Sequence, residues 1–68
     1  MERDVIIKAA ELLTAEEFIS ILEVENVNFD ILDQDDIMNA NSGYCNIEVE
    51  GLLEGESILF VDGKCSRF

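Results

Sequence analysis

Carboxylates are the side chains in this sequence that could do chemistry. The 68 residues include sixteen Asp and Glu against four Lys and Arg, with no histidine, and the formal net charge is -12. Paired carboxylates can act as general acid and base, but they need a dry cleft that splits their pKa values, and a chain this small has little room for one. Without histidine, a Ser or Cys nucleophile lacks its usual activating base. We therefore predict no catalytic residues and a protein that is not an enzyme.

Metal and cofactor sites are not predicted either. One acidic run resembles a calcium-binding loop; it comprises Asp30, Asp33, Asp35 and Asp36. A calcium loop that began at Asp33 would need an oxygen ligand at its fifth position and glutamate at its twelfth, where this chain has Ile37 and Tyr44. Cys45 and Cys65 lack the CxxC spacing or the histidines that would complete a zinc site. We expect no metal and no cofactor.

The termini and the cysteines predict a cytoplasmic protein. Lys8 interrupts the apolar run at the start of the chain, which is not typical of a secretory signal peptide. No stretch approaches the ~18 to 20 apolar residues of a membrane span. In that compartment Cys45 and Cys65 would be reduced, and we expect both to be small, buried or half-buried side chains.

The charge is unevenly distributed along the chain. All four basic residues lie near the ends, at Arg3, Lys8, Lys64 and Arg67, whereas residues 9 to 63 contain fourteen acids and no base. Ordinary surfaces intersperse both signs, although an acidic exterior that only keeps the protein in solution is the simpler interpretation. The functional interpretation is a surface whose potential attracts basic partners and repels nucleic acid and anionic membranes.

Two helices are expected in the first third of the chain, at about 4–13 and 15–22. Asp4 lies near the expected N-cap of the first helix. The sequence TAEE at 14–17 matches a capping box, in which Thr14 and Glu17 bond each other's backbone amides. One long helix through Thr14 is the alternative, but it would direct the polar stripes of its two halves roughly 150° apart. We therefore expect a break near Thr14.

The middle of the chain predicts a short strand and then a short helix or turn. Apolar and polar residues alternate over 27–31, which is a period-2 signal for a strand. Asp33 is a candidate N-cap for a short helix or turn over 34–41, and Gly43 is a candidate terminator.

The last third predicts a three-stranded antiparallel meander with strands at 44–52, 56–61 and 64–68. Leu53-Glu54-Gly55 fits a three-residue connection with glycine in the left-handed position, and Asp62-Gly63 is a strong two-residue hairpin signal. This turn would place Cys45 and Cys65 on strands separated by the middle one, which argues against a disulfide.

The expected three-residue connection also fixes a register between the first two strands of the meander. It pairs Ile47 with Val61 and Val49 with Leu59 on the core face, since residues that face the same way repeat every two. The opposite face would then combine carboxylates and apolar side chains, namely Glu48, Glu50, Leu52, Ile58 and Phe60.

In size, acidity and compact α+β character, the chain resembles the small proteins that phages carry against host defences, such as anti-CRISPR and anti-restriction proteins that imitate DNA. The residues that carry the resemblance are Glu16, Glu17, Glu23, Glu25, Asp33, Asp35, Asp36, Glu48, Glu50, Glu54 and Glu56. The resemblance implies a protein that binds and blocks a nucleic-acid-handling enzyme in the bacterial cytoplasm of the host.

These observations predict one α+β domain over residues 1–68 that inhibits a basic, nucleic-acid-binding partner protein without binding nucleic acid or membrane itself. Its carboxylates would occupy a Lys/Arg groove that normally receives phosphates, with a steep dependence on salt. The alternative is a small adaptor or dimerisation module, a homodimer included, that binds through the apolar patch around Leu52 and Phe60. The predicted partner-binding residues are Asp33, Asp35, Asp36, Glu48, Glu50, Glu54, Glu56 and Phe60.

Overall fold

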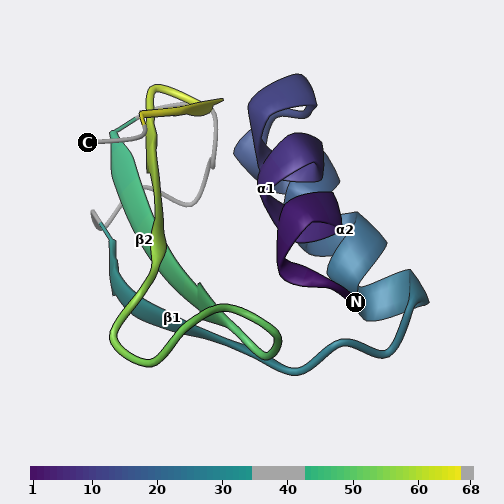
Figure 1. The fold of residues 1–68 in the computed structure, drawn as a ribbon. Coiled ribbons are helices and arrows are strands. Elements are labelled where there is room, and N and C mark those ends of the chain that lie inside the picture. Colours follow the sequence, from purple (N-terminus) through teal and green to yellow (C-terminus); the bar gives the residue numbers. More distant parts are fainter. Residues whose placement is uncertain (35–42, 67–68) are drawn as a thin grey trace.

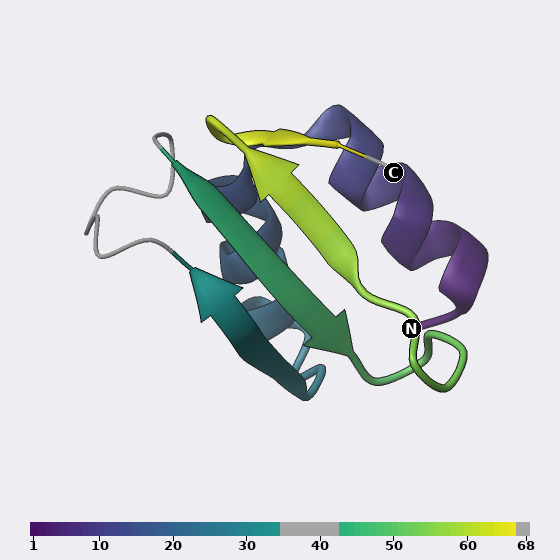
Figure 2. The ribbon, with the colours of Figure 1, turned by 90° about the vertical axis from the view of Figure 1, so that its left-hand side faces the viewer.

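In the part of the chain that the structure describes, two helices lie against one face of a four-stranded antiparallel sheet (Figure 1). A computed structural model describes residues 1–34 and 43–66. The helices are α1 (Arg3–Leu12) and α2 (Ala15–Val24), and the sheet order is β1 (Phe29–Gln34), β2 (Tyr44–Val49), β3 (Ile58–Val61) and β4 (Lys64–Cys65). Figure 2 shows the opposite face of the sheet in front of the helices. The predicted α+β class and the helical start of the chain are confirmed.

The break between the helices is set by the capping box. The Glu17 amide donates to Thr14 Oγ1 at 3.2 Å, and the Thr14 amide donates to Glu17 Oε1 at 3.0 Å. Both predictions, the break and the reciprocal cap, are confirmed. Asp4 lies in the first turn of α1, where a carboxylate is favoured by the helix dipole, and Glu2 is the N-cap residue. No helix in the described part of the chain is long and apolar enough to cross a membrane.

The core lies between the helices and one face of the sheet. Phe18 of α2 packs on Phe60 of β3 with ring centroids 5.4 Å apart, and both side chains are almost fully buried. The other buried apolar residues come from both helices and from the inner positions of β2 and β3; they are Ile6, Ile7, Ala10, Ala15, Leu22, Cys45, Ile47, Val49 and Ile58. Burial of these side chains is the main stabilising contribution in a chain of this size.

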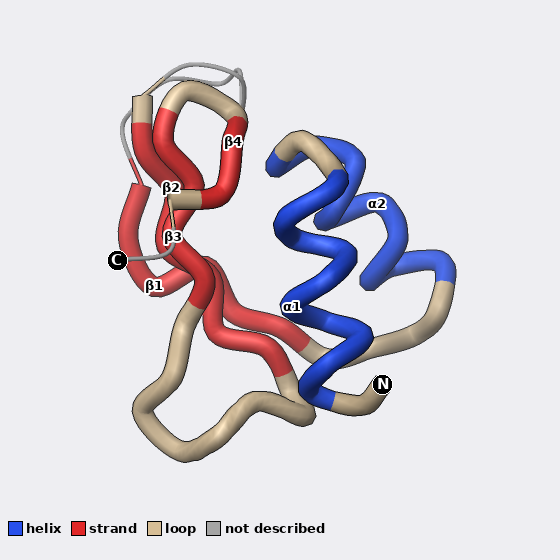
Figure 3. The backbone as a smooth tube through the Cα atoms, turned by 45° about the horizontal axis from the view of Figure 1, so that its top comes forward, coloured by secondary structure: helices blue, strands red, loops and turns tan. Residues whose placement is uncertain are grey.

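The two-residue hairpin at Asp62-Gly63 is confirmed. Both residues have positive φ, 52° and 84°, and Val61 pairs with Lys64 directly before and after them. This is the conformation that an Asp-Gly hairpin turn favours. The turn also docks on the helices, because the Ala15 amide at the start of α2 donates to the Gly63 carbonyl at 3.0 Å (Figure 3).

The same hairpin places the cysteines as expected. Cys45 on β2 and Cys65 on β4 both pair with Phe60 of β3, so a whole strand lies between them. Two strand spacings amount to about 9.5 Å, which exceeds the Cα separation that a disulfide spans.

The predicted register between the first two strands of the meander is wrong. Ile47 pairs with Ile58, not with Val61, and Cys45 pairs with Phe60. The displacement is three residues, and an odd displacement exchanges the two faces of a strand. Ile58 and Phe60 are therefore buried in the core, whereas Val61 is 42% exposed.

The cause is the connection between β2 and β3. It is not a three-residue turn but the whole of residues 50–57, with positive φ at Gly51 and Gly55 and an isolated bridge from Glu50 to Leu52. The longer connection lets Phe60 face inward, and burial of a phenyl ring is worth more than burial of the Val61 side chain that the predicted register would place there.

The strand predicted over 27–31 is present as β1, but its bounds differ. The strand begins at Phe29 and continues to Gln34, with a bulge between Ile31 and Asp33. Asp33 pairs with Asn46 of β2, so it is a strand residue and not the N-cap that the sequence indicated. Most of the predicted helix or turn over 34–41 lies outside the described residues, as do the last two positions of the predicted strand 64–68.

Candidate functional site

An acidic groove lies where β1, β2 and the 50–57 connection meet. Its volume is about 620 Å³. Four carboxylates line it, Asp30, Glu48, Glu50 and Glu54, and none of the described residues that line it is Lys or Arg. We call this feature the acidic groove.

The antiparallel pairing of β1 with β2 places the first two carboxylates opposite each other. Asp30 and Glu48 are register partners, and both are exposed on the sheet face that the helices leave uncovered. Directly opposite residues on one face have Cβ atoms about 4.5 to 5.5 Å apart, which is shorter than the ~8 Å screening length at physiological ionic strength. The potentials of the two carboxylates therefore add.

Glu50 extends this negative surface beyond the end of β2. Its amide donates to the Asn28 carbonyl at 2.9 Å, and its Oε2 accepts from Asn28 Nδ2 at 2.7 Å. The side-chain amide of Asn28 is neutral, so this hydrogen bond orients the Glu50 carboxylate without forming an ion pair.

Glu54 and Leu53 lie in the 50–57 connection. Glu54 is exposed, and Leu53 beside it is 63% exposed. The groove thus combines carboxylates with an apolar side chain at its border, a composition that suits a basic surface with an apolar contact residue.

Glu56 differs from the other predicted carboxylates because it has a basic partner. Arg3 at the start of α1 donates Nε to Glu56 Oε1 at 2.8 Å and Nη2 to Oε2 at 2.6 Å. Hydrogen bonding to Glu56 raises the pKa of the Arg3 guanidinium. Glu56 also accepts from the Leu53 amide at 3.0 Å, so it holds the 50–57 connection against α1. These contacts give Glu56 a structural role, and its partner-binding role stays a prediction.

The remaining predicted site residues lie elsewhere. Asp33 is exposed on β1 and accepts a hydrogen bond from the Tyr44 hydroxyl at 3.0 Å. Phe60 is 1% exposed, and Leu52 is half-buried against the core, so neither forms the exposed apolar patch that the sequence predicted. Asp35 and Asp36 lie outside the described residues.

The groove therefore brings together Glu48, Glu50 and Glu54 of the predicted residues, and it adds Asp30. The alternation of Asn28 and Asp30 in the sequence indicated one face of a strand, but nothing local indicated that this strand would pair with the one carrying Glu48. A pairing between segments almost twenty residues apart is set by the whole sheet.

The arrangement can act electrostatically. Within residues 1–34 and 43–66, no group of three or more His, Cys, Asp or Glu side chains is placed to hold a metal ion. Four carboxylates held on paired strands and a tethered connection present a fixed negative potential toward a large ligand.

Comparison with protein-family models, with curated proteins and with solved structures finds no match for this chain.

Proposed function

We propose that this protein is a non-enzymatic acidic inhibitor that binds a basic, nucleic-acid-binding surface of a partner protein, as anti-CRISPR and anti-restriction proteins do. The observation that supports it most is the acidic groove, in which Asp30, Glu48, Glu50 and Glu54 gather without a Lys or Arg among the described lining residues. Asp30 and Glu48 repel each other, so their placement opposite each other does not stabilise the fold.

The mechanism is competition with phosphates. A Lys/Arg surface that accepts a nucleic-acid backbone can accept carboxylates at similar spacing, because both are charge-assisted hydrogen bonds to oxygen anions. The net charge of -12 steers the protein toward such a surface and keeps nucleic acid itself away. Binding of this kind weakens steeply as salt rises.

The test is affinity capture from a lysate of the native host at low and high salt, followed by a competition assay with the captured protein and its nucleic acid. The informative variant is Glu48→Lys with Glu54→Lys, since both side chains are exposed and both line the acidic groove. We expect about a tenfold or larger loss of partner affinity from reversing two central charges.

The matched control is Glu23→Lys with Glu25→Lys at the end of α2. It makes the same change in net charge at two exposed acids that do not line the acidic groove. Equal loss in both double variants would show that only net charge matters. Capture that is indifferent to salt, or a captured protein that keeps its nucleic acid in the presence of the inhibitor, would contradict the proposal.

A further inference from the structure

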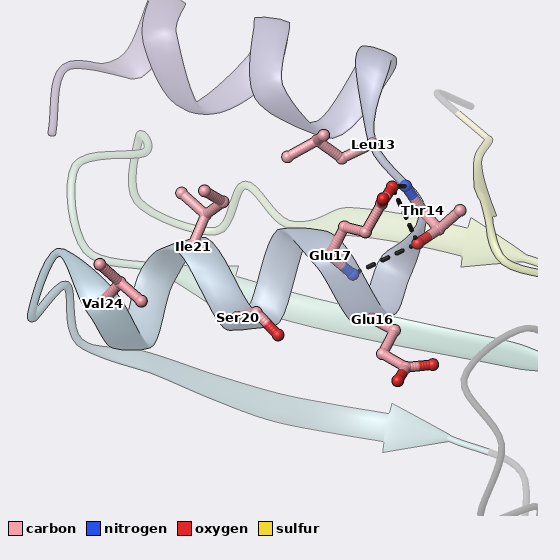
Figure 4. A pocket seen from close by; sticks show the side chains of 7 residues that line it. All are labelled: Leu13, Thr14, Glu16, Glu17, Ser20, Ile21 and Val24. Atoms are coloured by element: carbon pink, nitrogen blue, oxygen red, sulfur yellow. Dashed lines mark hydrogen bonds between the residues drawn. The ribbon is translucent and has the colours of Figure 1, made fainter.

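α2 carries two partly or largely exposed apolar side chains outside its buried stripe. Ala15, Phe18 and Leu22 are the buried stripe, whereas Ile21 is 38% exposed and Val24 is 78% exposed. Ile21 and Val24 line a groove of about 610 Å³ that also includes Leu13 at the end of α1 (Figure 4). The remaining lining residues are Thr14, Glu16, Glu17 and Ser20. We call this feature the α2 groove.

The spacing of the lining residues is that of a helix-packing seam. Positions 17, 20, 21 and 24 share one helix face by their i, i+3, i+4, i+7 spacing, with Ile21 and Val24 as its apolar members and Glu17 and Ser20 as its polar members. From Thr14 to Val24 the helix rises about 15 Å, which matches two to three turns of a partner helix. The backbone of α2 is bonded internally, so an extended segment would find no strand edge to pair with here.

Carboxylates at the α2 groove favour a helical partner that carries positive charge. Glu17 caps the helix with Thr14 at one end of the groove, and Glu16 is exposed, with its side chain pointing to the other side of α2 from Leu13 and Ile21 (Figure 4). None of the described lining residues is Lys or Arg. A second copy of this chain carries the same net charge of -12, so repulsion between the copies opposes self-association through this groove. A helix with Lys or Arg beside its apolar residues is complementary to the groove in both respects.

We propose that the α2 groove is a docking site for a basic amphipathic helix of a partner protein, with apolar side chains seated on Leu13, Ile21 and Val24 and cationic side chains beside Glu17. This surface is separate from the acidic groove and shares none of its lining residues. The proposal therefore stands or fails independently of the inhibitor function.

The test uses synthetic peptides of about 16 residues, long enough to form a helix on contact. The first carries Leu at i, i+3/i+4 and i+7 with Lys at the other positions. The second has the same composition with Leu spread around the helix, and the third has Glu in place of Lys. Amide chemical-shift mapping on the 15N-labelled protein reports both the affinity and the residues contacted. We expect the first peptide to bind, with shifts concentrated at residues 13–24.

The informative variant is Ile21→Ala with Val24→Ala, which shortens two exposed side chains and keeps strong helix formers in α2. We expect about a tenfold loss of affinity for the first peptide, the effect of removing buried apolar area from the contact. The matched control is Leu12→Ala, whose side chain is 76% exposed on α1 but does not line the groove. We expect this control to change the affinity less than twofold, and the urea midpoint of each variant shows that it is folded.

Five results would overturn the proposal. Equal binding of the second peptide would show attraction by charge alone, and shifts confined to Asp30, Glu48 and Glu50 would place the peptide in the acidic groove. Concentration-dependent shifts at 13–24 without peptide would make a second copy the occupant. Unchanged affinity in the Ile21→Ala, Val24→Ala variant would exclude those side chains from the contact. Failure of the first peptide to bind the wild-type chain at millimolar concentration would exclude the site.

Discussion

The two faces of β2 place neighbouring residues in opposite environments. Cys45, Ile47 and Val49 on the inner face are 6%, 0% and 3% exposed, whereas Tyr44 and Glu48 on the outer face are exposed. The inner face is apolar throughout, and its burial against α1 and α2 stabilises the fold. The outer face sets Glu48 opposite Asp30, a pairing that opposes folding. Inner-face residues of β2 therefore maintain the structure, whereas outer-face residues are the ones that the proposed function uses.

The largest expected effect is on the inner face at Phe60. We expect Phe60→Ala to lower the free energy of unfolding by about 3 to 5 kcal/mol, because it removes a buried ring that packs on Phe18. A loss of that size is comparable to the whole stability of a small domain. Urea denaturation followed by circular dichroism measures it.

Val61→Ala is the control for Phe60→Ala, since Val61 is the next residue along β3 and faces outward. We expect it to cost about 1 kcal/mol or less, the range of strand propensity. A larger decrease in the free energy of unfolding for Val61→Ala than for Phe60→Ala would favour the register that the sequence predicted, in which Val61 is buried and Phe60 faces outward.

The 50–57 connection sets the register of β3 against β2, and so decides which side chains of β3 are buried. At Gly51, φ is +115°, and an added Cβ would lie 2.5 Å from the Met1 carbonyl oxygen and 2.9 Å from Ile6 Cδ1. At Gly55, φ is +79°, and an added Cβ would meet nothing within 4 Å. We expect Gly51→Ala to cost about 2 kcal/mol or more, from backbone strain and the clash together, and Gly55→Ala about 1 kcal/mol, from strain alone. Urea midpoints of the two variants, measured side by side, give the comparison.

Equal costs at Gly51 and Gly55 would contradict the close approach of the connection to the N-terminal residues. A greater cost at Gly55 would favour the tight three-residue turn that the sequence predicted, in which only Gly55 needs the left-handed conformation.

These two regions also show what the sequence could and could not predict. The cap at Thr14 and the turn at Asp62-Gly63 depend on neighbours within three residues, and both are confirmed. The β2–β3 register depends on which of Ile58, Phe60 and Val61 the helices bury, and a plausible short turn led to the wrong choice. Local sequence signals predict where a helix, strand or turn lies. Which face of a strand is buried depends on how the whole core packs.

The candidate site follows the same division. The acidity of the segment was evident from the sequence, but the ion pair that removes Glu56 from it joins residues 53 positions apart. Asp30 entered the site only through strand pairing with Glu48. A charge count can therefore predict that a surface is acidic, but not which carboxylates have partners.

The third prediction tests the inner face through pH. Burial raises the pKa of the Cys45 thiol, so the folded protein keeps this proton at pH values where the unfolded chain has lost it. The folded state then binds more protons than the unfolded state, and the free energy of unfolding falls as pH rises above the ordinary thiol pKa of about 8.5. Urea titrations between pH 7 and 10 measure the slope.

Cys45→Ala is the control for the pH slope. It should lower the stability at neutral pH, because it removes a buried side chain, and it should reduce the decline above the thiol pKa. An identical slope in wild type and variant would assign the decline to other groups and contradict a thiol that is protected on the inner face.

The smallest expected effect is on the outer face, and it has the opposite sign. Because Glu48 lies opposite Asp30, we expect Glu48→Gln to raise the free energy of unfolding by about 0.2 to 0.5 kcal/mol, more at low salt than at high salt. The control is Glu23→Gln on α2, which makes the same change in net charge at a residue that faces no carboxylate in the strand register. The difference between the urea midpoints of the two variants gives the contribution of the Asp30–Glu48 repulsion. Glu48→Gln should at the same time weaken capture of the basic partner, so that stability and binding move in opposite directions. A decrease in the free energy of unfolding of Glu48→Gln would instead make Glu48 a structural residue like Glu56. Glu48 would then no longer count as a partner-binding carboxylate of the acidic groove.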